Sequence, residues 1–114
     1  MNKQYRVKKS DEIEMILKNH KSMANKYFVV YKKENYEALN FRYAISVGKK
    51  LGNAVVRNRV KRQMRSIIDS IIVPDLKMDV FVVARPSVCE LSYTKMYQNI
   101  IYLFNKLNIE NKGA

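Results

Sequence analysis

The stretch from Lys49 to Arg65 reads Lys-Lys-Leu-Gly-Asn-Ala-Val-Val-Arg-Asn-Arg-Val-Lys-Arg-Gln-Met-Arg, with seven Lys or Arg residues and no acid. Asn53 is a favourable helix N-cap, and Pro74 marks the end of the helix that follows. Apolar residues recur every three or four positions along the segment, which predicts an amphipathic helix packed on a sheet. These residues are Val56, Val60, Met64, Ile67 and Ile71.

The charged residues of this basic helix form a second stripe beside the apolar one. Arg57, Lys61 and Arg65 follow one another at i,i+4 spacing, where like charges mildly destabilise a helix. A charge run is usually a solvated face, but a helix that only aids solubility would mix Glu with Lys. The stacked cations therefore favour contacts with phosphate. Asn53 and Asn58 can add neutral hydrogen bonds, although capping explains Asn53 equally well.

The rest of the chain predicts an α+β fold. Runs of β-branched and aromatic residues predict strands at 27–33, 41–47 and 79–84. The first two are expected to pair as antiparallel neighbours, and the third, apolar throughout, to be buried at the centre of the sheet. Two further helices are expected, capped by Ser10 and Ser92. The expected architecture is a two-layer sandwich of helices on one mixed sheet. It forms a single domain over residues 1–114, with flexible tails at 1–9 and 109–114.

The composition limits the function. A formal net charge of +12 on 114 residues favours an anionic partner, nucleic acid above all. No apolar run is long enough to span a bilayer, and no signal peptide is visible. The single cysteine predicts a reducing, cytoplasmic location. One Cys and one His are too few for a zinc site, and no Ser/His/Asp set, carboxylate pair or Gly-rich phosphate loop predicts a catalytic residue.

The first predicted strand offers a second candidate site. Its alternation places Val29 and Tyr31 on one face of the sheet, and Phe28 and Val30 on the other. Phe28 and Val30 are expected to meet the basic and C-terminal helices, and Tyr31 to look towards the N-terminal helix. Core packing is the commoner explanation for a strand tyrosine. However, a groove between that helix and the sheet, flanked by the basic helix, would suit a single RNA strand.

The basic stretch resembles the signature of the bacterial ribonuclease P protein subunit. The family carries Lys-Lys, a variable residue, Gly-Asn-Ala-Val, Arg-Asn-Arg and a further Lys-Arg, all present between Lys49 and Arg62. Ser22 to Tyr31 resembles the family's first long strand, and the later elements also fit, so the resemblance covers nearly the whole chain. It implies αβββαβα order and a ribosomal protein S5 domain 2-like fold. This fold has an uncommon left-handed βαβ crossover around the basic helix, where general topology rules favour the right-handed one.

The resemblance also implies a function: a small basic partner of a catalytic RNA that helps to remove the 5′ leader of precursor tRNA. The RNA performs the endonucleolytic cut with Mg²⁺ that it mainly binds itself, so no protein residue is implied as catalytic or metal-binding. No membrane or obligate protein partner is implied. The implied RNA-binding residues are Lys49, Lys50, Asn53, Arg57, Asn58, Arg59, Lys61, Arg62 and Arg65. The implied leader groove comprises Ile13, Leu17, Val29 and Tyr31, with Arg57, Asn58 and Lys61 at its edge.

This chain departs from the family pattern at two groove positions. Family members often carry Phe where Ile13 and Leu17 stand here, so base stacking is expected to depend mainly on Tyr31. The residues alone leave two other functions open. One is a non-catalytic RNA-binding module, such as a ribosome-associated protein. The other is a self-sufficient protein nuclease, which the missing acid cluster disfavours.

Overall fold

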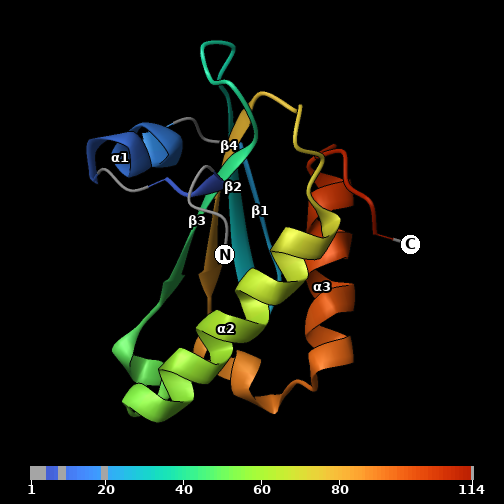
Figure 1. Cartoon of the computed structure of the whole chain (residues 1–114). Helices are drawn as coiled ribbons and strands as arrows, with labels where there is room; N and C mark the ends of the chain where they lie inside the picture. Colours follow the sequence, from blue (N-terminus) through green and yellow to red (C-terminus); the bar gives the residue numbers. More distant parts are fainter. Residues whose placement is uncertain (1–4, 8–9, 19–20, 114) are drawn as a thin grey trace.

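The computed structural model describes residues 5–7, 10–18 and 21–113. Within these residues, three α-helices and four strands follow one another in the expected αβββαβα order, and short 3₁₀ helices lie in two of the connections (Figure 1). In chain order the elements are α1 (Ser10–Lys18), β1 (Ser22–Ala24), β2 (Phe28–Glu34), β3 (Arg42–Val47), η2 (Lys49–Leu51), α2 (Ala54–Ile71), β4 (Met78–Ala84), η3 (Pro86–Glu90) and α3 (Tyr93–Lys106).

The order of strands in the sheet is β1-β2-β4-β3. The sequence predicts antiparallel pairing of the strands at 27–33 and 41–47, and this prediction is wrong. β4 lies between them, antiparallel to β2 and parallel to β3, so that Phe81 stands beside both Tyr31 and Ala44. The reason is burial: six of the seven β4 residues are buried, and a strand that is apolar on both faces is most favourable at the centre of the sheet, where helices cover both faces. The predicted central place of this strand is confirmed, while the hand of the β3–α2–β4 crossover stays a prediction.

The expected long strand from Ser22 to Tyr31 is divided into β1 and β2, which pair antiparallel. Asn25 causes the break. Its side-chain Oδ1 accepts hydrogen bonds from the backbone N–H groups of Tyr27 and Phe28, both at 2.9 Å. An Asx turn of this kind reverses the chain locally.

The two faces of the sheet carry different layers. α2 and α3 cover one face and enclose the main core, whereas α1 lies against the other face (Figure 1). Phe28 and Val30 are fully buried in the main core, as their alternation predicts. On the opposite face a small cluster consists of Val7, Ile16, Ala44 and Phe81, with Ile13, Tyr31 and Val83 packed against it.

Two of the three predicted helix caps and the apolar stripe of α2 are confirmed, whereas Ser10, predicted as a cap, is itself the first residue of α1. Asn53 and Ser92 cap α2 and α3 through their side chains. The apolar stripe of α2 is buried except at its first residue, Val56, which is half-buried. After α3, Ile109 is buried, and the backbone N–H of Lys112 donates to the Ile71 carbonyl, so the chain returns to the end of α2.

A candidate nucleic-acid interface

The approach to α2 is set by Gly52. Its φ of +145° is unfavourable for any residue with a side chain, and an added Cβ would lie 3.3 Å from the Cβ of Val56. Leu51 is buried and anchors η2, which leaves Lys49 and Lys50 exposed just before the helix. The N-cap is made by the Oδ1 atom of Asn53, which accepts from the Val56 N–H at 3.0 Å.

A basic groove runs along the solvent side of α2. It measures ≈ 470 Å³ and brings together four of the predicted RNA-binding residues with one apolar neighbour. Lys61 and Arg65 are half-buried, whereas the other three members are exposed. The lining residues are Val55, Asn58, Lys61, Arg62 and Arg65. Three cations and one amide around one groove suit a chain of phosphates, because the groove holds several positive charges at fixed positions.

No described residue forms a salt bridge with the cations of α2. Within the described ranges, the salt bridges join Arg42 to Glu12 and Asp79, and Lys26 to Glu90, and none involves α2. The one acid of α2, Asp69, is turned towards the sheet, where its Oδ1 accepts from the Tyr43 hydroxyl at 2.6 Å. The positive potential of the helix therefore remains available to an anionic partner.

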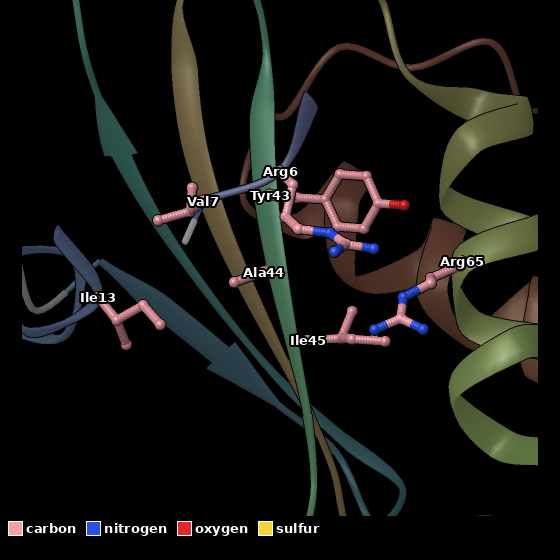
Figure 2. Close-up of a pocket in the computed structure, with 7 residues that line it drawn as sticks. All are labelled: Arg6, Val7, Ile13, Tyr43, Ala44, Ile45 and Arg65. Carbon is pink, nitrogen blue, oxygen red and sulfur yellow. The ribbon is translucent and has the colours of Figure 1, made fainter. Parts of the chain in front are cut away.

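A second hollow, of ≈ 150 Å³, crosses the edge of β3 and connects α2 with the α1 side of the sheet. Figure 2 shows Arg65 reaching from α2 and Arg6 from the N-terminal segment, both on the same side of β3 as the Tyr43 ring. Ile13 of α1 lines the same hollow. The Nε atoms of Arg6 and Arg65 are buried without a hydrogen-bond partner. Arg65 thus belongs both to this hollow and to the basic groove.

The N-terminal segment is held where it can contribute Arg6. Arg6 forms a parallel bridge with Tyr43, and the Val7 N–H donates to the Tyr43 carbonyl at 2.9 Å. Val7 is buried in the small cluster beneath α1. These contacts extend the sheet at its β3 edge over a single residue pair.

Two of the four residues predicted for the leader groove, Ile13 and Tyr31, lie in the same cluster, and the groove itself stays a prediction. Ile13 and Tyr31 pack on the same small cluster, whereas Leu17 is 39% exposed. Val29 is half-buried and stands opposite Val83 in the sheet. The ring of Tyr31 stacks on Phe81, with centroids 6.2 Å apart and an interplanar angle of 29°. Tyr31 therefore has a second aromatic ring at its side.

A charged network attaches α1 to the sheet. The Arg42 guanidinium contacts Glu12 of α1 at 2.6 Å and both carboxylate oxygens of Asp79, at 2.9 and 3.0 Å. Asn35 donates a further hydrogen bond to the same carboxylate at 3.0 Å. These bonds raise the pKa of Arg42, chiefly through Asp79. The network fixes the position of α1, and with it Ile13, over the sheet.

The structure separates some of the predicted residues and adds others. Arg59 lies on the flank of α2 away from the basic groove. Arg6 and Phe81 were not among the predicted site residues. Phe81 could have been found from strand alternation, since odd-numbered residues of β4 face α1. Nothing in the sequence places Arg6 beside Arg65, because the two are joined only through the bridge to β3.

Metal-ligating side chains do not gather in the part of the chain that the structure describes, where no group of three or more His, Cys, Asp or Glu residues could hold an ion. In the same residues, no helix is long and apolar enough to cross a membrane.

Comparisons with known proteins agree with this geometry. The family model for ribonuclease P matches residues 1–108. The ribonuclease P protein component of Bacillus cereus is 41% identical over 110 residues, which cover 93% of each protein. A solved structure of the Staphylococcus aureus RNase P protein superposes with a TM-score of 0.82 at 35% identity, covering 92% of this chain and 96% of that one. The structure of the Thermotoga maritima RNase P protein superposes with a TM-score of 0.74 at 27% identity, covering 89% of this chain and 96% of that one.

An α+β scaffold that presents a strongly cationic helix, whose single acid faces the sheet, defines a class of basic proteins suited to an anionic partner. Within that class, the chain belongs to the ribonuclease P protein family. It is thus a subunit of an RNA-processing endoribonuclease complex, and its partner is the RNA subunit of that complex.

Proposed function

We propose that the protein binds the catalytic RNA of ribonuclease P through α2 and its approach, and holds the 5′ leader of precursor tRNA between α1 and the sheet. The leader is removed by an endonucleolytic cut that gives the mature tRNA 5′ end. The observation that carries the proposal is the place of Arg65, which lines both the basic groove and the hollow shared with Ile13. One continuous surface can therefore serve two RNA segments.

The RNA-binding role extends over the predicted set of Lys49, Lys50, Asn53, Arg57, Asn58, Arg59, Lys61, Arg62 and Arg65, to which we add Arg6. Guanidinium groups at four α2 positions supply directional donors for phosphate oxygens, and the lysines supply point charges. The leader groove consists of Ile13, Leu17, Val29 and Tyr31, in which the Tyr31 ring offers a surface for a base.

The chemistry is assigned to the RNA. We place the Mg²⁺ ion mainly on the RNA subunit, as the family resemblance implies, and the protein contributes binding and orientation. The single cysteine supports a reducing compartment, and the cytoplasm is proposed as the location.

Reconstitution tests the assignment. Purified protein and its RNA subunit should together cleave precursor tRNA at the mature 5′ end at a salt and Mg²⁺ concentration where the RNA alone is slow. Protein alone, or protein with a catalytically inactive RNA, should not cleave. Cleavage by the RNA-free protein would overturn the assignment of chemistry to the RNA.

Salt titrations test the α2 interface. Arg62→Ala should weaken RNA binding and reduce the slope of log K against log salt by about 0.7–0.9, the share of one phosphate contact. Lys77→Ala is the matched control, because it removes one exposed positive charge beyond the end of α2. An Arg62→Ala slope equal to that of the wild type would contradict the proposed interface.

Binding of precursor tRNA and of mature tRNA by the same variant tests the leader groove. Tyr31→Ala should weaken binding of leader-bearing precursor tRNA, by about 1–3 kcal/mol if one base stacks on the ring, and leave mature tRNA nearly unchanged. Tyr102→Ala, at an exposed position on the outer side of α3, is the control. Equal losses for both substrates would place Tyr31 outside the leader path.

A further inference from the structure

The flank of α2 opposite the basic groove borders a separate hollow of ≈ 280 Å³, here called the α2–α3 hollow. Arg59 and Gln63 lie one helical turn apart on this flank, away from the stripe of Arg57, Lys61 and Arg65. Of the residues that line it, only Arg59 belongs to the predicted RNA-binding set. The walls come from α2, η3 and the start of α3: Arg59, Val60, Gln63, Val88, Cys89, Leu91, Ser92, Tyr93 and Met96.

The lining of this hollow is divided between an apolar floor and a polar rim. Val60, Val88 and Met96 are each at most 1% exposed and form the floor. Arg59 and Cys89 are exposed at the rim. Sites for drug-sized ligands usually enclose about 300–1,000 Å³, so this hollow suits one small ring system. A nucleobase has apolar faces and a polar edge, and matches such a lining.

Tyr93 gives the hollow a fixed aromatic wall. Its side chain is 43% exposed, although it stands at the first residue of an otherwise well-buried helix face. The hydroxyl lies 2.9 Å from the Oγ atom of Ser66 and thereby ties α3 to α2. Because this bond restricts the ring before any ligand arrives, stacking on it costs little further side-chain entropy.

The charges around the hollow favour an anionic ligand. Arg59 makes no salt bridge with any described residue. Lys49 and Lys50 of η2 stand close by, since the Cys89 Sγ contacts the Leu51 carbonyl at 3.5 Å and joins η3 to η2. The nearest acid of η3, Glu90, is paired with Lys26 at 3.4 Å.

We propose that the α2–α3 hollow receives one unpaired nucleobase of the partner RNA. The base stacks on Tyr93, its edge meets the Gln63 amide, and the adjoining phosphate meets Arg59. This rests on the proposed function and extends it. The RNA would then contact α2 on both flanks, with phosphates in the basic groove and a base in the α2–α3 hollow.

Cys89 provides a probe within the wild-type protein, because it lines the hollow and is the only cysteine of the chain. The rate of its alkylation by iodoacetamide is measured with and without a saturating amount of the ribonuclease P RNA. Occupation of the hollow should slow alkylation by about tenfold or more. An unchanged rate at proven saturation would overturn the proposal while leaving RNA binding itself intact. Failure to bind the RNA at all would instead overturn the proposed function.

Variants test the aromatic wall. Tyr93→Ala should weaken RNA binding by about 5- to 150-fold, the range expected for one base stacked on an aromatic ring. Tyr93→Phe removes only the bond to Ser66 and should keep most of the affinity, which separates stacking from folding. The control is Tyr102→Ala, on the outer side of the same helix. If Tyr93→Ala stays folded by circular dichroism and binds as tightly as Tyr102→Ala, no base stacks there.

Discussion

The two faces of the sheet differ in how completely they are covered. The face towards α2 and α3 contributes to a core in which residues such as Phe28, Val30 and Val80 are entirely buried. The face towards α1 has a small cluster, beside which Val29, Tyr31 and Val83 remain half-buried. The first face holds the fold together. The second is therefore free to present apolar side chains to a partner, because few contacts compete for them.

The largest expected effect tests this difference directly. Phe28→Ala should lower the free energy of unfolding by about 3–5 kcal/mol, since it empties a large site in the main core. Ile16→Ala, in the small cluster, should cost less and should mainly release α1. Urea unfolding gives the two free energies, and amide exchange of α1 shows the local effect. Equal global losses for both variants would mean that the two faces contribute alike.

Breaking the network beneath α1 should have the next largest effect. Arg42→Met leaves the Asp79 carboxylate, whose side chain is only 4% exposed, without its cation. A loss of about 3–5 kcal/mol is expected from such an unpaired buried charge. The double variant Arg42→Met/Asp79→Asn should recover much of the lost stability, because the buried charge is then removed as well. Urea unfolding of the single and double variants measures both values, and no recovery in the double variant would show that Arg42 acts by packing alone.

The cap of α2 should have a smaller effect that also resolves a question about function. Asn53→Ala should cost about 1 kcal/mol of stability because the Val56 N–H loses its acceptor. Asn53→Ser should restore the cap. If Asn53→Ser restores both the stability and the RNA affinity of the wild type, Asn53 serves only to cap the helix. If Asn53→Ser restores the stability but not the RNA affinity, the Asn53 side chain contacts RNA.

The smallest expected effect is a pH-dependent contribution of Tyr43 to the free energy of unfolding. Burial, together with the bond to Asp69, strongly raises the pKa of Tyr43. The stabilisation from the neutral phenol is complete below the unfolded pKa of about 10 and is lost as the pH rises above it. Tyr43→Phe should cost about 1 kcal/mol at pH 7, and this difference from wild type should shrink above about pH 10. Urea unfolding of both proteins between neutral and alkaline pH measures this stability difference, with Tyr102→Phe as control. A gap independent of pH would contradict the raised pKa.

Much of the fold could be predicted from local pattern. The caps at Asn53 and Ser92 and the buried stripe of α2 each depend on residues close together in sequence. Strand partners could not be predicted in the same way, because the place of β4 depends on competition between strands for the centre of the sheet. The turn at Asn25 was also missed, since a side-chain bond to the backbone interrupts a run that otherwise reads as one strand.

The candidate site was predictable where it lies on a single element. The spacing on α2 placed Lys61 and Arg65 together, as the basic groove shows. Contributions from other elements were not visible: Arg6 comes through an isolated bridge, and Phe81 through the register of β4 against β2. Tyr93 and Gln63 likewise line the same hollow only because α3 packs beside α2.

The central position of β4 has a consequence for biosynthesis. β2 and β3 leave the ribosome well before Met78–Ala84, and neither has its long neighbour until that segment emerges. Contacts between distant segments form slowly, and open strand edges promote association between chains. The nascent polypeptide therefore passes through a stage in which most of it has been made but the sheet lacks its central strand, and in this interval its open strand edges are most exposed to association.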